Sequence, residues 1–251
     1  MGQTSGTIHK GLAALSLLGE HPHGATAGEV AQESGLPFST AYRLLNTLVE
    51  AEYVELDAVT KRYHLGLRVF ELGQRVASAR GYDAVALAVL RTVTERTGES
   101  ALLAVLDGDH FLTVHTVDGP QYRTTTDPGD RGPLHTSALG RALLAFAPQA
   151  QREKLLNSLD LTPRTPGSLV DRERLREEVA QARTRGWASQ WEEHDVGMGA
   201  VAVPVVTAGG CLLGAVALAA PMFRCERADL EGQVPVLKEA AARLAAQLPL
   251  R

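Results

Sequence analysis

Residues 26–54 combine two short helical patterns, a glycine between them and a strand-like pattern after them, and this combination restricts the fold more than any other part of the chain. Thr26 and Glu29 have the spacing of a capping box, which predicts a helix that begins at Thr26. Gly35 can adopt the left-handed conformation that ends a helix, and Pro37 is suited to the start of the next one. The pattern predicts a helix-turn-helix.

The second predicted helix has one apolar and one polar face. Four apolar side chains recur at i, i+3, i+4 and i+7, the spacing of a stripe that faces a core: Ala41, Leu44, Leu45 and Leu48. The opposite face and its flanks carry hydroxyls, an amide and an arginine, which suit contacts with phosphates and base edges. Unless this is an ordinary amphipathic surface helix, we expect its DNA-binding residues to be Ser39, Thr40, Tyr42, Arg43, Asn46 and Thr47.

A hairpin is predicted after these helices. Residues 53–56 and 62–65 alternate as strands do, and residues 57–61 join them, which is the pattern of a wing. Lys61 and Arg62 lie near its predicted tip, where they could hold DNA phosphates or reach the minor groove. Upstream, helical spacing predicts a support helix packed under the motif through Ile8, Leu12, Leu15 and Leu18.

The chain resembles the IclR family of bacterial transcriptional regulators in five elements that follow the family's order: GLPFSTAYRLLNTLVEAEYV, YHLGLRVFELG, PLHTSALGRALLA, RGWASQWEEHDVGMGAVAVPV and GAVALAAPMFR. The resemblance spans almost the whole chain. It implies an N-terminal winged helix-turn-helix and a C-terminal effector-binding α/β domain similar to the GAF fold. It also implies a homodimer or homotetramer, a dimer of dimers, that represses or activates a metabolic or catabolic operon in response to a ligand. The expected partner is a pseudo-palindromic operator in double-stranded DNA.

Length and pattern agree with a division into a small domain and one of ordinary size. We expect residues 1–65 to form the winged helix-turn-helix, residues 66–80 a linker helix, and residues 81–251 the effector-binding and oligomerisation domain. In the last part, strand pairs interleaved with helices favour an α/β (α+β) fold around an antiparallel sheet. Pro235 is expected to break or kink the final helix, residues 227–248.

The charge balance is unusual for a DNA-binding protein. The chain has a formal net charge of −4, and residues 1–65 alone carry a net charge of −3 from four basic and seven acidic side chains. DNA-binding modules are typically basic, so we expect poor non-specific affinity and a larger share of phosphate contacts from hydroxyls and backbone N–H groups. A lysine or arginine is common in the family where this chain has Phe38, so one phosphate contact is expected to be missing.

Other functional classes find little support in the sequence. No apolar run approaches the ~20 residues of a membrane span and no signal pattern is present, so a cytoplasmic protein is expected. The sequence has no phosphate-binding glycine loop and no metal-type spacing around Cys211 and Cys225, so no cofactor or metal is expected. A redox sensor using these two thiols stays an alternative.

Catalysis is the other alternative, and it would have to use the one dense cluster of ionisable residues, 192–195, EEHD. Adjacent side chains on a loop do not all point at one spot, and no partner group is evident elsewhere. We therefore expect no catalytic residues and read this cluster as a solvated loop beside the effector pocket. A C-terminal domain with an enzymatic or purely scaffolding role remains open.

The family resemblance places the effector between the loop before the ALGRA helix and two later strands. It implies seven lining residues, each of which could instead be packed core: Ala138, Leu139, Gln190, Met198, Ala200, Ala217 and Ala219. Some family members have cysteine, serine or aspartate at four of these positions, whereas this chain has methyl groups and a neutral amide. An anionic effector would lack partners, so a fairly apolar or aromatic metabolite is expected, unless charged side chains reach the site from Arg123, Arg131 or His135.

Overall fold

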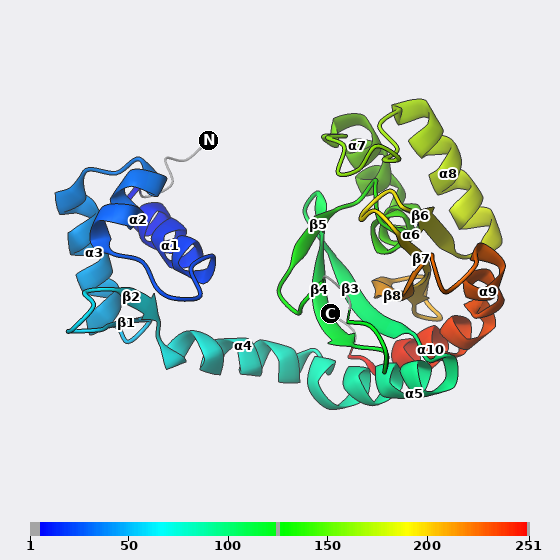
Figure 1. Ribbon diagram of the computed structural model, residues 1–251, viewed down its shortest axis with the longest axis horizontal. Coiled ribbons are helices and arrows are strands. Elements are labelled where there is room, and N and C mark those ends of the chain that lie inside the picture. Colours follow the sequence, from blue (N-terminus) through cyan, green and yellow to red (C-terminus); the bar gives the residue numbers. More distant parts are fainter. Residues whose placement is uncertain (1–5, 124–125, 250–251) are drawn as a thin grey trace. The chain divides into compact units, whose positions relative to one another are not determined.

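The chain folds into two units, Met1–Ala77 and Ser78–Arg251 (Figure 1). The computed structural model describes residues 6–123 and 126–249. Within these ranges no helix has the length and apolar character needed to cross a membrane. Helix α4, Leu67–Ala79, runs across the boundary between the units, so the predicted domain limits at residues 65 and 80 stay a prediction.

The first unit is a winged helix-turn-helix, as the sequence predicted. It contains α1, Gly6–Gly19; α2, Ala27–Ser34; and α3, Phe38–Glu50. Strands β1, Val54–Leu56, and β2, Tyr63–Leu65, pair antiparallel to form the wing. A small core holds these elements together: Ala14, Leu18, Ala25, Ala27, Val30, Ala31, Ala41, Leu45, Val54 and Tyr63.

The predicted packing face of the support helix is wrong in part. Ala14 and Leu18 are buried, but Ile8 and Leu12 are 66% and 58% exposed. The buried face of α1 is centred on Ala14, whose small side chain lets the neighbouring helices approach closely, and Ile8 and Leu12 lie outside it. Helical spacing showed that α1 carries apolar residues, but it did not show which of them pack against the core of the unit.

Helix α4 also leaves its apolar side chains uncovered. None of its residues is buried, and four large ones are exposed: Leu67, Phe70, Leu72 and Val76. An amphipathic helix gains its stability mainly from packing an apolar face, so this stripe is available for contact with another surface.

The second unit is built on one antiparallel sheet of six strands in the order β5-β4-β3-β8-β7-β6. The strands are β3, Ser100–Asp107; β4, His110–Val117; β5, Arg131–Pro133; β6, Ala188–Trp191; β7, Met198–Val206; and β8, Leu212–Pro221. The predicted α/β class with an antiparallel sheet is confirmed.

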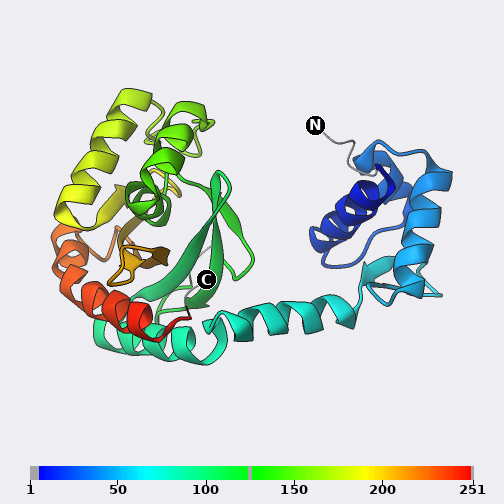
Figure 2. The same cartoon turned by 180° about the vertical axis from the view of Figure 1, so that it is seen from behind.

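Helices cover both faces of this sheet. One face packs against α6, Ala138–Phe146, with α7, Gln149–Ser158, and α8, Arg172–Arg185, beyond it. The other face packs against α5, Leu87–Thr97, and α10, Val234–Gln247, which lie side by side in both views (Figures 1 and 2). A π-helical turn, Tyr82–Ala86, precedes α5. The predicted final helix is divided into α9, Arg227–Gly232, and α10, with Pro235 in the first turn of α10.

Strands β7 and β8 place side chains of different size on the two faces. Toward α10 they present mainly valine and leucine, such as Val203 and Leu218, whereas toward α6 they present alanines: Ala200, Ala202, Ala215, Ala217 and Ala219. Successive side chains of a strand alternate between faces, so this contrast is set by the sequence with a period of two. Small side chains on one face leave space between the sheet and α6.

Candidate DNA-binding surface and effector pocket

The turn between α2 and α3 is fixed by local hydrogen bonds. The Thr26 hydroxyl accepts from the backbone N–H of Glu29 at 3.2 Å, and the Glu29 carboxylate accepts from the backbone N–H of Thr26 at 2.7 Å. Gly35 ends α2 with φ of 66°, a conformation that glycine adopts without strain. The predicted capping box and glycine turn are therefore confirmed, and they set the position of α3.

Helix α3 buries its apolar stripe and exposes most of its predicted DNA-binding face. Ala41, Leu44 and Leu45 are buried, whereas the side chains of Ser39 and Arg43 are exposed. Tyr42 and Thr47 are also exposed, and Thr40 and Asn46 are partly buried.

Two of the predicted DNA-binding residues make contacts within the unit. The Tyr63 hydroxyl of the wing donates to Asn46 Oδ1 at 3.3 Å, and the Thr47 hydroxyl donates to the backbone oxygen of Arg43 at 3.0 Å. The Asn46 carbonyl is therefore occupied and its amide N–H groups are left to act as donors. Of the exposed polar groups, Ser39 and Arg43 are the best placed to contact bases or phosphates.

The tip of the wing is a compact turn built on Asp57. Its carboxylate accepts from the backbone N–H of Val59 at 2.8 Å and from the Thr60 hydroxyl at 2.7 Å. These hydrogen bonds, that of Thr60 first, lower the pKa of Asp57. Lys61 follows with φ of 57° and an exposed side chain, which fits its predicted contact with phosphates.

Arg62 makes its contacts within its own unit. Its guanidinium donates to the Gly24 carbonyl at 2.8 Å and to both carboxylate oxygens of Glu29, at 3.2 and 3.3 Å. The hydrogen bonds from Thr26 and then the charge of Arg62 lower the pKa of Glu29. Arg62 thus joins the wing to the start of α2 in this structure, and its predicted contact with a phosphate stays a prediction.

The second unit contains a cavity of about 60 Å³ between α6, the sheet and the loop after β6. All seven residues that the family resemblance implied line it: Ala138, Leu139, Gln190, Met198, Ala200, Ala217 and Ala219. Further lining residues, which the sequence analysis did not assign to the pocket, are Leu102, Phe111, Thr126, Ser137, His194, Asp195 and Gly199. Arg123, Arg131 and His135 are not among the lining residues.

The sheet supplies the apolar wall of this cavity. Ala200 and Ala219 are directly opposite each other on β7 and β8, and Ala217 is opposite Leu102 on β3. Phe111 on β4 completes the wall, and its ring lies over Gly132 of β5, where any Cβ would collide with it. The small alanine side chains leave the cavity open, and the Phe111 ring forms one of its boundaries.

Helix α6 reaches the cavity through its first turn. The Ser137 hydroxyl caps the helix by accepting from the backbone N–H of Gly140 at 2.9 Å and donates to the Pro133 carbonyl at 3.3 Å. Gly140 packs directly on the backbone of Leu134, where a Cβ would not fit. This close approach holds Ala138 and Leu139 against the sheet.

The side-chain amide of Gln190 forms hydrogen bonds with the loop that follows β6. Its side-chain oxygen accepts from the backbone N–H groups of Glu193 at 2.9 Å and His194 at 3.4 Å. Its side-chain nitrogen donates to the Met198 carbonyl at 3.3 Å. The polar atoms of Gln190 are therefore satisfied by the protein itself.

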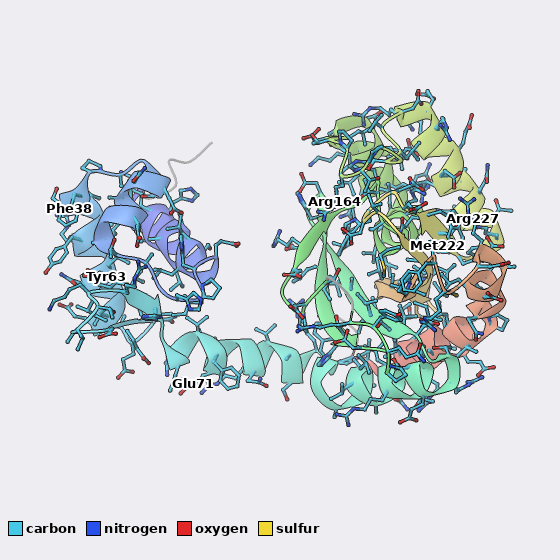
Figure 3. The ribbon with its side chains drawn as sticks, in the orientation of Figure 1. Phe38, Tyr63, Glu71, Arg164, Met222 and Arg227 are labelled. Carbon is cyan, nitrogen blue, oxygen red and sulfur yellow. The ribbon has the colours of Figure 1, made fainter. Side chains whose placement is uncertain are left out.

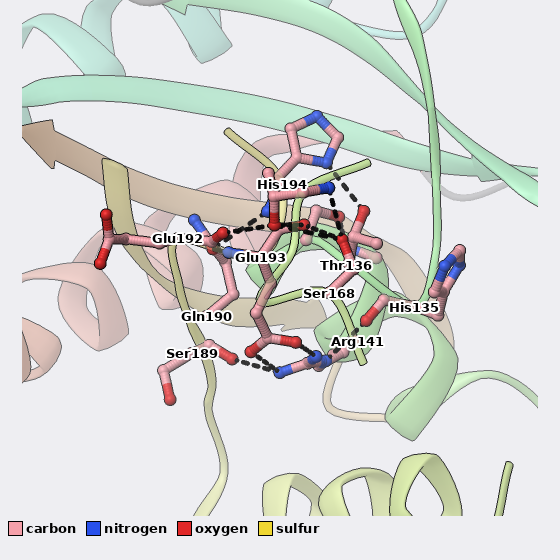
Figure 4. A network of polar contacts seen from close by, with 12 residues as sticks. His135, Thr136, Arg141, Ser168, Ser189, Gln190, Glu192, Glu193 and His194 are labelled. Atoms are coloured by element: carbon pink, nitrogen blue, oxygen red, sulfur yellow. Dashed lines mark hydrogen bonds and ion pairs between the residues drawn. The ribbon is translucent and has the colours of Figure 1, made fainter. Parts of the chain in front are cut away.

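A buried ion pair fastens the same loop to α6 (Figure 4). Arg141, whose side chain is 3% exposed, forms a two-fold contact with the carboxylate of Glu193, at 2.9 Å through Nη1 and a second contact through Nη2. It also donates to the backbone oxygens of His135 at 2.9 Å and Ser189 at 3.0 Å. The prediction of a solvated loop at residues 192–195 is therefore wrong for Glu193, whose side chain is only 15% exposed and is paired with Arg141.

His194 is the aromatic polar group of the pocket. Its Nδ1 lies 3.0 Å from the Thr136 hydroxyl, and its ring centroid lies 6.0 Å from that of Phe111. Burial first, and then the nearby charge of Arg164, lowers the pKa of His194 to about 4. The ring is therefore neutral near pH 7, and its Nε2 makes no hydrogen bond with the residues that the structure describes.

Nothing in the described residues suggests a metal site, since no group of three or more histidine, cysteine, aspartate or glutamate side chains is gathered there. The four residues 192–195 also point to different partners. Glu192 accepts from the backbone N–H of Gly197, Glu193 binds Arg141, His194 approaches Thr136, and Asp195 lies 3.5 Å from Arg164. Such divergence does not assemble an acid–base site.

Two family models match the chain over most of its length. The IclR helix-turn-helix domain matches residues 7–58, and the bacterial transcriptional regulator IclR C-terminal domain matches residues 74–246. The chain belongs to the IclR family of bacterial transcriptional regulators. The recognition made from sequence motifs is confirmed, as is ligand-responsive regulation through DNA binding. IclR regulators are not enzymes in general.

Several proteins and solved structures of the family are similar to this chain over most of its length. The probable transcriptional regulator SauR of Cupriavidus necator is 34% identical over 84% of each protein, and KdgR of Escherichia coli is 28% identical over 96% of this chain and 92% of its own. An IclR regulator from Alicyclobacillus acidocaldarius has a TM-score of 0.85, 29% identity and coverage of 97% and 98%. An IclR homologue of Microbacterium hydrocarbonoxydans, solved with 4-hydroxybenzoate, has a TM-score of 0.81, 25% identity and coverage of 96% and 98%.

The other lining residues were missed by the sequence analysis because their sequence context does not distinguish a pocket from a packed core. Phe111 and Leu102 alternate on ordinary strands, and nothing in their sequence context separates a pocket wall from core. His194 was noticed only as part of a charged cluster. A signal did exist, because a lone histidine in a segment that also carries an implied pocket residue, Gln190, is a plausible lining group.

Proposed function

We propose that this IclR regulator binds a small, neutral, largely apolar or aromatic effector in the cavity beside His194, and that binding changes its affinity for a pseudo-palindromic operator. The observation that carries the proposal is the convergence of all seven implied residues on one cavity whose walls are mostly methyl groups and rings. Such a bacterial regulator would work in the cytoplasm, where its operator DNA is.

The charges around the cavity argue against an anionic effector. Gln190 is satisfied by the loop, His194 is neutral near pH 7, and Asp195 adds a carboxylate to the lining. A buried carboxylate on the ligand would therefore lack a charged partner, which is costly in an apolar site. The 4-hydroxybenzoate complex of the Microbacterium homologue supports a single-ring effector for this chain, whereas the proposal that the ring is neutral rests on the lining residues.

The size of the cavity suggests how binding is transmitted. Drug-sized ligands occupy about 300–1,000 Å³, whereas this cavity measures about 60 Å³. A ring compound must therefore displace part of the wall. We infer that this part is the His194 side chain, whose polar contact is with Thr136, because its loop is anchored by Gln190 and Arg141. A ligand shifts a conformational equilibrium only if it binds the two states differently, and a displaced His194 ring supplies that difference.

Thermal-shift measurements with matched pairs of ring compounds test this proposal. Each pair has one neutral and one anionic member, such as 4-hydroxybenzamide and 4-hydroxybenzoate. We expect only neutral members to raise the melting temperature, and those that do to release operator DNA in an anisotropy titration. Stabilisation by anionic members alone would contradict the proposed chemistry, and stabilisation without any change in DNA affinity would contradict the proposed coupling.

We further propose that the protein is a homodimer, or a dimer of dimers, in which α4 contributes to the contact between copies. The support is the apolar stripe of α4, where Leu67 and Phe70 are 73% and 64% exposed. Sedimentation of the full chain with Phe70→Glu is expected to show a shift toward monomer, whereas Arg68→Glu on the same helix serves as a charged control. An unchanged mass for Phe70→Glu would exclude α4 from the contact.

The redox alternative receives less support. Cys225 is buried, and burial raises the pKa of its thiol, which disfavours the reactive thiolate. Cys211 is exposed, in the turn between β7 and β8. Mass spectrometry after mild oxidation, combined with operator binding, would reveal a redox response if oxidation of either thiol changed DNA affinity.

A further inference from the structure

The recognition helix carries an exposed aromatic pair on its first turn. Phe38 is 59% exposed and Tyr42 is 48% exposed, and their ring centroids are 6.1 Å apart with the planes 20° from parallel. Figure 3 shows Phe38 at the outer edge of its unit, with Tyr63 of the wing further inside. Exposed large apolar side chains on the predicted DNA-binding face of α3 indicate a contact surface for a partner.

The surroundings of this pair strengthen the point. Tyr63 is 3% exposed and hydrogen-bonded to Asn46, and burial together with the nearby Tyr42 raises its pKa. The side chain of Phe38 takes part in no core cluster of its unit. Neither Phe38 nor Tyr42 belongs to the core of the unit, so the pair is not needed to stabilise the fold.

We propose that the Phe38–Tyr42 stack reads thymine methyl groups in the major groove of the operator. This inference rests on the proposed DNA-binding role of α3. In helix-turn-helix proteins the first residues of the recognition helix contact base edges, and thymine presents its C5-methyl group in the major groove, where aromatic and other apolar side chains contact it.

The polar inventory of the same surface favours this mode of recognition. The Asn46 carbonyl and the Thr47 hydroxyl are engaged within the unit, and Arg62 is bound to Glu29. Residues 1–65 carry a net charge of −3, so phosphate attraction is weak for a DNA-binding unit. Ser39, Arg43 and the amide N–H groups of Asn46 stay available for polar contacts, and apolar contact with thymine adds discrimination to theirs.

The test begins with the full chain and a random pool of DNA duplexes, from which the preferred operator is selected. That operator is then synthesised with each thymine replaced by uracil, which removes the methyl group and leaves the base pairing intact. Removing one buried methyl group is expected to weaken binding about fourfold, and one in each half-site about 16-fold. Uracil at positions away from α3 is expected to have no effect.

Variants assign the methyl contact to the aromatic pair. Phe38→Ala, at an exposed position that does not support the core, is expected to bind thymine and uracil operators with nearly equal affinity. Phe223→Ala, the same substitution at an exposed phenylalanine of the other unit, is expected to keep the wild-type ratio. The thymine-to-uracil ratio is the readout, because a general loss of affinity would leave it unchanged.

The outcomes separate this inference from the proposed function. Selective binding to an operator that tolerates uracil everywhere, or a uracil penalty that persists in Phe38→Ala, would overturn the thymine contact while leaving DNA-binding regulation intact. Failure to select any duplex would overturn both. A penalty present in the wild-type protein and lost in Phe38→Ala supports the inference.

Discussion

Enlarging Ala217 by two carbon atoms tests whether the space beside it is a binding cavity or ordinary core. Ala217 is 1% exposed on β8 and borders the cavity of about 60 Å³. Each buried methyl group contributes about 0.8 kcal/mol, so Ala217→Val could add about 1.6 kcal/mol to the free energy of unfolding. Eliminating the cavity, at about 24 cal/mol per Å³, gives about 1.4 kcal/mol.

Steric strain lowers this gain, so we expect the free energy of unfolding to rise by between zero and about 1.5 kcal/mol. At about 2–4 °C per kcal/mol for a unit of this size, the melting temperature rises by at most about 6 °C. The same change occupies the space an effector needs, so stabilisation by a neutral ring compound should be lost while operator binding is kept.

Ala202→Val is the matched control. Ala202 lies directly opposite Ala217 on β7 and is fully buried, but it does not line the cavity. Adding bulk to a filled core costs about 1–3 kcal/mol, so this variant should lose stability.

Tryptophan fluorescence during urea unfolding is a suitable assay, because the only two tryptophans, Trp187 and Trp191, both belong to the second unit. If Ala217→Val loses as much stability as Ala202→Val and still responds to effector, the assignment of the cavity is wrong.

Three further predictions concern single residues. Arg43→Ala should weaken operator binding by about 1–3 kcal/mol and relax sequence preference, and an unchanged anisotropy titration would remove Arg43 from the DNA-binding face. Lys61→Ala should lower affinity for all sequences and reduce the salt dependence by about one unit, whereas Arg62→Ala should leave that slope unchanged because Arg62 is bound to Glu29; equal slopes for both variants would contradict this distinction. The pKa of His194 is lowered from 6.5 to about 4, so the unfolded chain binds the proton more tightly and the free energy of unfolding falls as pH drops from about 6.5 toward 4. In His194→Gln this fall should be smaller in fluorescence-monitored urea unfolding, and an identical pH profile would show that His194 is not responsible.

Local sequence patterns predicted the first unit well because local interactions form it. The capping box of Thr26, the left-handed Gly35 and the buried stripe of α3 all depend on residues within four positions of each other. The support helix failed at Ile8 and Leu12 because its apolar residues occur on more than one side, and only tertiary contacts decide which side is buried.

Contacts between residues far apart in the sequence could not be predicted from sequence patterns. Arg62 meets Glu29 across 33 positions, and Arg141 meets Glu193 across 52, so neither spacing carries information about the contact. The pocket residues came from the family resemblance, since an alanine that lines a cavity and an alanine that fills a core look the same in one sequence. The structure distinguishes them, as Ala217 and Ala202 illustrate.

The hydrogen bonds of Gln190 have a consequence for how related regulators can change their ligands. The same amide forms part of the pocket surface and holds the loop that carries His194, through Glu193, His194 and Met198. An aspartate at this position could accept from the loop but could not donate to Met198, and it would bring a charge into the cavity. A new ligand preference acquired at Gln190 therefore changes the geometry of the opposite wall in the same mutational step. Substitutions at the surrounding alanines can change ligand preference without affecting this loop. A substitution at Gln190 also removes hydrogen bonds of the loop and therefore requires a compensating change in residues 192–198.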